Sequence, residues 1–506
     1  MNWALYAILG VPLVAVLLTL LDGWRPIGDR PARAATLVAG LVSLGLAITL
    51  AITVEHGRVL DTAGGWLRLD SLGAVFLLAT GLLYAMAGIF SIGYLAADEA
   101  HGDFQRFAKR YYALLNLFGW TMLLVPLAAD FGTLWVAVEL TTIISALLVA
   151  IDRTDAALEA SWKYVLIASS GLGIALLSII VLYATGTHAL GGAYIPRFTR
   201  FLAHAHGLSP DAVRLAFVLS VVGFGTKVGF VPTHTWLPDA HSEAPAPVSA
   251  LLSGSLLAGA FYAILRFFQV AVAAGERSFA EHTLIVFGVI SLVTASFFVL
   301  RQGNYKRLLA YSSIEHMGII ALGIGFGAPL AVAGALLHVI THASAKGLAF
   351  FGTGSLLRGY GTKEVEGVTG AGTRMPWTGP MFFAAALALC GLPLSGVFRS
   401  EFEIVAGGFA RGGGFVNTGA TILIVFVNLA FFGIIWHTGQ MVLTPAAGAS
   451  GLPSGDGAPA VAERSGWMIA GMLGCLFVVV ALGVHLPGDL SALLNNAGHR
   501  LAVPLP

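Results

Sequence analysis

The sequence carries very little charge for its length. Of its 506 residues only 10% are Asp, Glu, Lys or Arg and 57% are hydrophobic, whereas about a quarter of the residues are charged in an average soluble protein. The two signs nearly balance, with 27 basic and 26 acidic residues. The chain therefore lacks both the basic surface of nucleic-acid binding proteins and an acidic tail. This composition excludes an ordinary soluble protein and predicts an all-α integral membrane protein.

Cysteine is also scarce. Cys390 and Cys475 both lie inside apolar runs, where they form neither a disulfide framework nor a metal cluster. An H-x-H pair at His204 and His206 has a spacing that suits a metal ion, but the surrounding FTRFLAHAHG favours a solvated amphipathic helix. We therefore predict no metal site, no cofactor and no redox centre in this chain. A signal peptide is not expected either, because 3–21 is long enough to span a membrane and no basic segment precedes it.

Hydrophobic windows of about 19 residues predict fourteen membrane-spanning helices. The predicted spans are 3–21, 34–54, 71–95, 110–128, 131–151, 159–184, 212–231, 245–269, 279–300, 307–325, 328–356, 376–405, 418–442 and 466–486. Two longer connections remain, 185–211 and 443–465. The Gly, Pro, Ala and Ser content of the second predicts a flexible cytoplasmic loop.

The positive charges in the connecting loops predict the orientation. An even number of spans places both termini on the same side of the membrane. The loops on one side contain fifteen Lys and Arg residues, and those on the other side contain eight. Because the richer side is normally cytoplasmic, we predict a multi-pass protein of the bacterial plasma (inner) membrane with both termini on the periplasmic side.

Ionisable residues inside the predicted spans are the functional candidates, because a charge at the bilayer centre costs roughly 2.5–3.5 kcal/mol on insertion scales. The fifth span carries Glu139 and the seventh carries Lys227. The eleventh carries His338, His342 and Lys346 at intervals of four residues, which places all three on one helical face. The tenth and twelfth spans add Glu315, His316, Arg399, Glu401 and Glu403.

A structural ion pair, or a side chain that reaches the headgroups, is the alternative for each of these residues. Arg266 lies close to the end of its span, so we expect it to reach the interface. Glu139 and Lys227 lie too deep for that, and a row of three basic residues exceeds what one structural pair needs. Arg399 and Glu403 suit mutual neutralisation as well as a functional role.

Two of the predicted spans are interrupted beside their ionisable group. Lys227 is followed by Gly229 and Pro232, and Glu401 follows the string CGLPLSG. Irregular backbone at membrane depth is tolerated only where it is buried in protein or lines a wet cavity. A pair of broken helices in corresponding halves of a chain is typical of inverted repeats around a central transport site.

The chemistry of these residues suits proton transfer. Carboxylates, amines and imidazoles exchange protons through water, so the row of His338, His342 and Lys346 is more typical of a proton wire than of a sugar or amino acid pocket. Where Glu139 faces Lys227, the proton affinity of the lysine depends on the position of the carboxylate. The two groups then titrate as a coupled pair.

Three long strings, KVGFVPTHTWLPDAHSEAPAPVSALLSG, YSSIEHMG and HVITHASAKGLAFF, resemble the antiporter-like membrane subunits of respiratory complex I and its relatives. The resemblance covers most of the chain. The string WVAVELTTIISALLVAIDRTDAALEASWKYVLIASSG is most similar to component F of hydrogenase-4, a membrane subunit of energy-converting hydrogenase complexes. No part of the chain resembles a quinone, flavin or iron–sulfur site.

The resemblance implies a fold of fourteen helices with two inverted five-helix repeats, spans four to eight and nine to thirteen, each containing one broken helix. It divides the chain into an N-terminal three-helix segment (1–109), a first repeat (110–269), a second repeat (279–442), and a loop with the last span (443–506).

The resemblance also implies roles in proton transfer. Glu139 and Lys227 match the acid and lysine pair of the family, and Lys346 matches a lysine that some members carry on the eleventh span. Glu401 matches the broken-helix residue near the outer exit. The connecting histidines of the family are matched by His338 and His342, and its tenth-span motif by His316.

One position departs from the family. Members usually have a lysine in the middle of the eighth span, or a histidine one turn earlier, but this chain reads LLSGSLLAGAFYAILRFF with Ala258 at the matching place. Either Ser253, Ser255 and water bridge the gap, or protons do not cross the whole subunit.

The sequence thus predicts a proton-translocating membrane subunit of a hydrogenase-like or complex I-like redox complex, not catalytic by itself. Its expected partners are other membrane subunits, a peripheral nickel-iron hydrogenase-like or iron–sulfur module, protons and the lipid bilayer. An Mrp-type sodium/proton antiporter subunit shares the same motifs. A non-pumping membrane scaffold for a peripheral enzyme, and a variant coupled to inorganic carbon uptake, are also compatible with the sequence.

Overall fold

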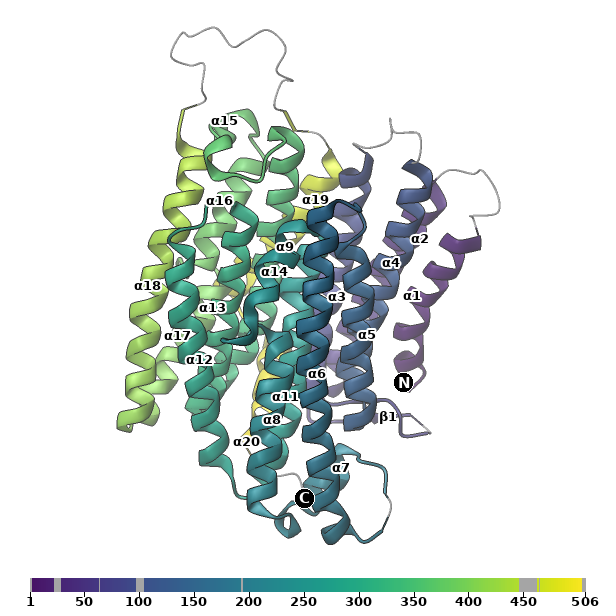
Figure 1. Ribbon diagram of the computed structural model, residues 1–506, viewed down its shortest axis with the longest axis vertical. Helices are drawn as coiled ribbons and strands as arrows, with labels where there is room; N and C mark the ends of the chain where they lie inside the picture. Colours follow the sequence, from purple (N-terminus) through teal and green to yellow (C-terminus); the bar gives the residue numbers. More distant parts are fainter. Residues whose placement is uncertain are drawn as a thin grey trace, which may run out of the picture.

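The structure is a computed structural model that describes residues 2–21, 29–62, 64–96, 104–192, 194–445, 462–463 and 465–502. Within these ranges the chain is almost entirely helical, with one antiparallel ribbon of two short strands (Figure 1). This architecture confirms the predicted all-α class. Most of the predicted flexible loop 443–465 lies outside the described residues.

The elements follow one another as long helices joined by short connections. The first part of the chain contains α1 (Trp3–Leu21), α2 (Arg30–Val54), β1 (Leu60–Asp61), β2 (Arg68–Leu69), α3 (Ser71–Ala96), α4 (Phe104–Leu124), η2 (Val125–Leu127), α5 (Phe131–Val149), α6 (Asp155–Leu190), α7 (Phe198–Ala203) and η3 (Ala205–Gly207). The middle contains α8 (Pro210–Val228), η4 (Thr233–Thr235), α9 (Trp236–Glu243), α10 (Ala246–Leu251), η5 (Leu252–Leu256), α11 (Leu257–Ala273), α12 (Arg277–Val299) and α13 (Tyr305–Phe326). The last part contains α14 (Pro329–Tyr360), η6 (Val365–Gly367), α15 (Ala371–Arg374), α16 (Thr378–Leu389), α17 (Gly396–Arg411), α18 (Gly414–Leu443), α19 (Gly466–Val484) and α20 (Gly488–Ala502).

Successive long helices run in alternate directions through the bundle. The start of α1 and the end of α20 lie toward the same end of the molecule, and the end of α18 lies at the opposite end (Figure 1). Among the described residues, 11 helices or helical runs are long and apolar enough to cross a membrane. The three other predicted spans coincide with α4, α14 and the α16–α17 pair. Polar residues in α4 and α14 and the break between α16 and α17 account for the difference.

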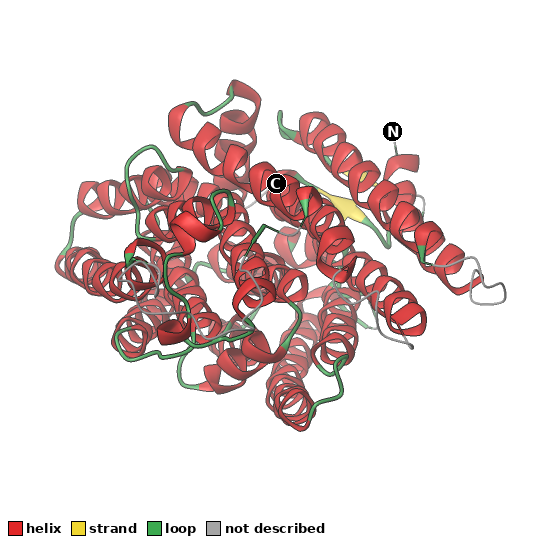
Figure 2. Ribbon diagram, turned by 90° about the horizontal axis from the view of Figure 1, so that it is seen from above, coloured by secondary structure: helices red, strands yellow, loops and turns green. Residues whose placement is uncertain are grey.

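Helices α10, α11 and α13 are the most deeply buried, and α3 and α14 are also largely buried. The apolar window of α13 is wholly buried, whereas only a third of the corresponding window of α1 is buried inside the protein. Seen from above, α1 and its neighbours form one flank of the packed helices (Figure 2). The ionisable residues in the middle of α13 and α14 are therefore buried inside the protein, namely Glu315, His316, His338, His342 and Lys346.

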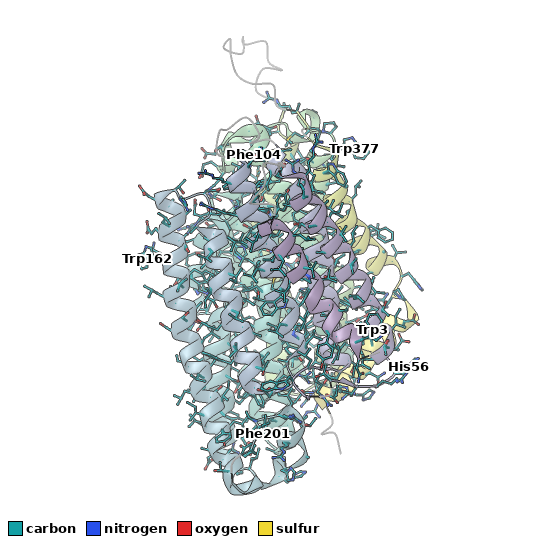
Figure 3. The ribbon with its side chains drawn as sticks, turned by 90° about the vertical axis from the view of Figure 1, so that its right-hand side faces the viewer. Trp3, His56, Phe104, Trp162, Phe201 and Trp377 are labelled. Atoms are coloured by element: carbon teal, nitrogen blue, oxygen red, sulfur yellow. The ribbon has the colours of Figure 1, made fainter. Side chains whose placement is uncertain are left out.

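Exposed tryptophans mark both ends of the bundle. Trp377 lies close to one end and Trp3 toward the other (Figure 3), and both side chains are more than half exposed. Such amphipathic rings concentrate at the two membrane–water interfaces. Large apolar side chains such as Phe432 and Phe477 are exposed as well, as expected for helices that contact lipid.

Both predicted helix interruptions are present. Helix α8 ends at Val228, and Gly229 then adopts a left-handed conformation with φ of +89°. The second break separates α16 from α17, and there Gly391 and Leu394 have φ values of +66° and +77°. Glycine adopts such angles at little cost, which explains why the sequence places it at both breaks.

A third irregularity was not predicted. Helices α10 and α11 are joined by the π-helical turn η5, which contains Ser253, Gly254 and Ser255. A Cβ atom at Gly254 would collide with the Leu83 side chain of α3 and lie 2.9 Å from the Ala343 backbone of α14. The missing side chain therefore lets three helices approach closely at the centre of the molecule.

The prediction that Arg266 reaches the membrane interface is wrong. Its side chain is 3% exposed, and its guanidinium donates two hydrogen bonds of 2.9 Å to the two oxygens of the Asp70 carboxylate. The hydroxyl of Tyr262 and the amide oxygen of Gln269 accept its remaining hydrogen bonds. A bidentate acid partner 196 residues away in the chain explains the burial, and the position of Arg266 within its span did not reveal that partner.

Candidate functional site

The ammonium group of Lys227 is fully buried at the end of α8, directly before the first helix break. Its Nζ donates to Thr142 Oγ1 at 2.6 Å and to the Tyr164 hydroxyl at 2.5 Å. The same Nζ lies 4.7 Å from the centroid of the Tyr164 ring. Two hydroxyl groups thus compensate the loss of water around this charge.

Tyr164 fixes the lysine relative to the helix break. Its hydroxyl is 2.8 Å from Ser145 Oγ, and its ring stacks on Trp236 with a centroid distance of 4.4 Å. Trp236 opens α9 on the far side of the break and donates its indole hydrogen to the Thr226 carbonyl at 2.8 Å. A movement of α9 relative to α8 would therefore displace Trp236 and, through the stacked rings, change the position of Tyr164 next to Lys227.

Glu139 lies on α5 in the same neighbourhood. One carboxylate oxygen accepts a hydrogen bond of 2.8 Å from Ser169 Oγ, and Oε2 is buried without a hydrogen-bond partner. Among the described residues no ion pair within 4.0 Å joins Glu139 to Lys227, although the carboxylate acts electrostatically on both Lys227 and Tyr164. The acid and the lysine are thus separated in this conformation, with Tyr164 interacting with each.

A second cluster of buried ionisable groups surrounds α14. Lys346 Nζ donates to the Leu309 carbonyl at 3.0 Å and interacts electrostatically with Glu315 on α13. Ser313 Oγ donates to the same Leu309 carbonyl at 2.9 Å and is 2.7 Å from Ser253 Oγ. A short series of polar contacts therefore leads from the π-helical turn to Lys346.

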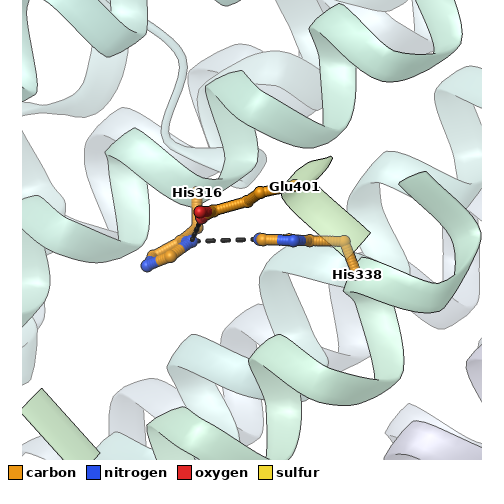
Figure 4. A group of neighbouring side chains, drawn as sticks. All are labelled: His316, His338 and Glu401. Atoms are coloured by element: carbon orange, nitrogen blue, oxygen red, sulfur yellow. Dashed lines mark hydrogen bonds and ion pairs between the residues drawn. The ribbon is translucent and has the colours of Figure 1, made fainter. Parts of the chain in front are cut away.

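Of the histidines of this cluster, His342 and His338 precede Lys346 on α14 by one and two helical turns, and His316 lies on α13. His338 Nε2 is 3.0 Å from His316 Nδ1, and its Nδ1 is 2.8 Å from Ser400 Oγ. His316 Nδ1 is also 3.8 Å from Glu401 Oε1 (Figure 4). The ring of His342 lies 5.0 Å from that of His316, and neither of its nitrogens has a hydrogen-bond partner.

Glu401 sits against the second helix break. Its Oε2 packs so closely on Gly391 that a Cβ atom there would collide with it. Glu401 also borders a cavity of about 240 Å³ that Cys390, Asn428 and Phe402 help to line. Phe402 is well exposed on the outer surface, so this cavity connects the carboxylate with the periphery of the bundle.

The neighbouring pair Arg399 and Glu403 behaves differently. Arg399 Nε is 3.1 Å from Glu403 Oε1 across one turn of α17, and both side chains are partly exposed. This contact supports mutual neutralisation, one of the two interpretations that the sequence allowed. The two residues are therefore left out of the site.

The structure brings the seven candidate residues into two groups. Glu139 and Lys227 lie at the first break, and His316, His338, His342, Lys346 and Glu401 lie between α13, α14 and the second break. Sequence analysis did not single out the neutral hydroxyl partners Thr142, Tyr164 and Ser400. Hydroxyl residues are frequent in membrane helices, and the strings that hold these three carry no distinguishing signal.

The described residues thus form a bundle of membrane-spanning helices with buried ionisable groups at two of its helix breaks. A family of transmembrane segments described as NADH:quinone oxidoreductase/Mrp antiporter matches residues 128–427. A hydrogenase-4 component F homolog from Methylacidiphilum infernorum is 35% identical over 432 residues, which cover 84% of this chain and 87% of that protein. The chain belongs to the NADH:quinone oxidoreductase/Mrp antiporter family.

Solved structures share the fold. A chain of the membrane-bound sulfane sulfur reductase, an archaeal respiratory membrane complex, has a TM-score of 0.84 at 22% identity and covers 99% of this chain and 98% of its own. A chain of the Mrp complex from a Dietzia species has a TM-score of 0.84 at 20% identity and covers 100% and 98%. The resemblance predicted from the three motif strings is confirmed.

Proposed function

We propose that this chain is a proton-translocating membrane subunit of a hydrogenase-like or complex I-like redox complex. The observation that carries the proposal is the pair of buried ionisable clusters, each placed at a helix break. Buried charges at membrane depth are costly and mark ion pathways in membrane proteins. The sequence similarity to a hydrogenase-4 component F homolog supports the choice of complex.

The order of the helices supports two inverted repeats within fourteen spans, with the domain bounds 1–109, 110–269, 279–442 and 443–506. Glu139 and Glu315 lie on the second predicted span of each repeat. Lys227 and Glu401 lie on the fourth, and both fourth spans are broken. The equivalent placement of two acid-bearing helices and two broken helices is the arrangement typical of transporters with inverted repeats.

In this proposal Lys227 holds a proton that Glu139 and Tyr164 control. The lysine keeps its proton while a carboxylate is near, and loses it more readily when only neutral hydroxyl groups surround it. Displacement of α9 would change these distances through Trp236. Lys346, Glu315, His338, His342 and His316 then pass protons toward Glu401 and the neighbouring cavity.

The weakest connection lies between the two clusters. Among the described residues no hydrogen bond joins the Lys227 group to Ser253. From Ser253 onward, the contacts through Ser313 and the Leu309 carbonyl reach Lys346. Ser255 does not take part in this series of contacts, because its Oγ is hydrogen-bonded to Thr80 Oγ1 at 2.8 Å. Water therefore has to complete the path near Ala258, where relatives usually carry an amine.

Two measurements test the proposal. Affinity purification in mild detergent should yield other membrane subunits together with a nickel-iron hydrogenase-like or iron–sulfur module, and a chain that purifies without partners would contradict the complex. In vesicles that contain the assembled complex, proton transfer should not require sodium. A strict requirement for a sodium gradient would instead establish an Mrp-type antiporter.

Substitution of the first cluster tests the proton path itself. Lys227→Ala and Glu139→Ala should each abolish proton transfer while the complex still assembles. The double variant should be scarcely worse than either single variant, since members of one functional unit are not additive. Clearly additive defects would show that the two residues act separately, and unchanged transfer in a well-assembled complex would support a scaffold.

A further inference from the structure

One group of side chains in the second cluster has the composition and spacing of a metal site. We propose that His316, His338 and Glu401 bind a divalent transition-metal ion of the Zn²⁺ class. Their ligand atoms lie within 4.8 Å of one another and come from α13, α14 and α17. This is the one such group of three among the described residues.

The distances fit coordination after small side-chain rotations. His316 Nδ1 and His338 Nε2 are 3.0 Å apart, and His316 Nδ1 is 3.8 Å from Glu401 Oε1 (Figure 4). Tetrahedral ligands at 2.0–2.2 Å from a zinc ion are about 3.3–3.5 Å from each other. Two imidazole nitrogens and one carboxylate oxygen are a ligand set that Zn²⁺ accepts, with one position left for water or a fourth ligand.

Ser400 orients His338 for this role. The Ser400 hydroxyl donates to the Val397 carbonyl at 2.8 Å, so its oxygen accepts the hydrogen bond from His338 Nδ1–H. His338 Nε2 is then the unprotonated nitrogen, which is the form that binds a metal. Metal-ligating histidines usually donate their second N–H in this way.

The same side chains contain polar atoms that lack partners. Glu401 Oε1 and His316 Nε2 are buried without a hydrogen bond, and the Glu401 side chain is more than nine-tenths buried. An unpaired buried carboxylate oxygen is costly, and a cation between the three residues would remove that cost. The ring of His342, whose two nitrogens are also unpartnered, lies 5.0 Å from that of His316.

The cavity at Glu401 gives an ion a route to the site. Its volume is about 240 Å³, and Asn428 and Cys390 border it as well as Glu401. The binding step depends only on these contacts. One consequence does rest on the proposed function: an ion that occupies the lone pairs of His338 and Glu401 would block proton transfer through them.

Cobalt(II) is a suitable probe, because tetrahedral Co²⁺ with nitrogen and oxygen ligands absorbs visible light. The intact complex is purified with an affinity tag that contains no histidine, stripped with a chelator and titrated with Co²⁺, and bound Co²⁺ is then displaced with Zn²⁺. His204 and His206 are replaced by alanine throughout, so that the exposed H-x-H pair contributes no signal. We expect one equivalent of Co²⁺ with tetrahedral absorption.

Matched variants assign that signal. Glu401→Gln and His338→Gln should weaken binding at least about tenfold, and Ser400→Ala should weaken it by about 10–100-fold through loss of the orienting hydrogen bond. Glu403 lies two residues from Glu401 on the same helix, so the Glu403→Gln variant is the control and should bind Co²⁺ with the affinity of the parent protein. Equal affinity in all four variants, or no tetrahedral Co²⁺ in the parent, would overturn the site. Should His338→Gln fail to assemble, the Ser400→Ala result decides.

Proton uptake measured with and without Zn²⁺ separates the two proposals. The comparison uses the parent complex and Ser400→Ala. This variant keeps all three proposed metal ligands, including His338 and Glu401, which also belong to the proposed proton path. Zn²⁺ should inhibit uptake by the parent, and a higher Zn²⁺ concentration should be needed for the same inhibition of Ser400→Ala. Metal binding without any inhibition would uphold the site and contradict the proton path through His338 and Glu401.

Discussion

The ammonium of Lys227 is held by hydroxyl groups, those of Tyr164 and Thr142, rather than by a carboxylate. Neutral partners satisfy the N–H donors without fixing the positive charge as strongly as an ion pair would. In the proposed function, this lysine changes its protonation state when Glu139 approaches or withdraws. The hydroxyl of Tyr164 is the natural intermediary, since it also contacts Ser145.

Tyr164→Phe tests this role. The substitution removes the hydroxyl and keeps the ring that stacks on Trp236, so the complex should assemble normally. Loss of a positioned group in proton transfer commonly lowers rates by about 10²–10⁴-fold, and we expect at least a tenfold decrease in proton uptake by vesicles. Tyr183→Phe, on the same helix but with its ring against Tyr194, should leave uptake unchanged. Normal uptake in Tyr164→Phe would remove the tyrosine from the path.

Ala258 offers a second test at the scale of one residue. It is buried, and it follows Ser255 by one helical turn. If water and polar groups already fill this region, Ala258→Lys should assemble and transfer protons at least as fast as the parent complex. In a dry apolar contact the new ammonium would cost several kcal/mol and impair assembly. Ala258→Met has similar bulk without charge, so a defect confined to the lysine variant would argue against a continuous water path.

The charged members of both clusters were predictable, because Glu139, Lys227 and the residues of α14 stand out within apolar runs. Their hydroxyl partners were not, since serine and threonine in membrane helices often hydrogen-bond their own backbone, and nothing in the sequence shows which side chain the Tyr164 hydroxyl contacts. The separation of Glu139 from Lys227 was also beyond the sequence, because residue spacing within each helix does not specify distances between helices.

Among the elements, the helix breaks differ in how well the sequence predicts them. The breaks after Val228 and after Leu389 combine glycine with proline inside an apolar run, and both were predicted from that pattern. The π-helical turn Leu252–Leu256 contains no proline, and its extra residue is accommodated without any left-handed angle. Its cause lies in packing, since α3 and α14 approach the backbone at Gly254.

Gly254→Ala should therefore be costly. A methyl group would collide with the Leu83 side chain and meet the Ala343 backbone at 2.9 Å, and overpacking of this kind destabilises by about 1–3 kcal/mol. We expect a lower thermal denaturation midpoint of the purified protein. Gly259→Ala is the matched control, because its methyl group would find Val125 at an ordinary 3.5 Å. Equal midpoints for the two variants would show that the turn tolerates a side chain.

At the scale of the whole molecule, the alternating helices place the start of α1 and the end of α20 at one end of the bundle (Figure 1). The count of positive charges predicts that the opposite end faces the cytoplasm. Reporter fusions at Pro506 and within 443–465 should accordingly report opposite sides, with the 443–465 fusion cytoplasmic. Fusions that report the same side would show that the last span does not cross the membrane.

The arrangement of the bundle followed from the sequence only in outline. Span positions were predictable from apolar length, and α4, α14 and the α16–α17 pair show that polar residues do not prevent a helix from lying inside the bundle. The pairing of distant helices was not predictable. In the sequence, Asp70 is an acidic residue beside a loop and Arg266 is an arginine near the end of a span. Their ion pair becomes apparent only in the three-dimensional structure.

Helix α20 bears on how the protein is made. Arg500 donates to Ser71 Oγ at 3.0 Å and to the Gly57 carbonyl at 2.9 Å, and its own carbonyl accepts from Gln269 at 2.9 Å. Ser71 precedes Arg500 by 429 residues, so at about 5–20 residues per second a ribosome needs roughly 20–90 seconds between them. During that interval the Ser71 hydroxyl and the Gly57 carbonyl lack their Arg500 partner. The contact between α20 and the start of α3 therefore forms only after the helices that lie between them in the chain have been synthesised.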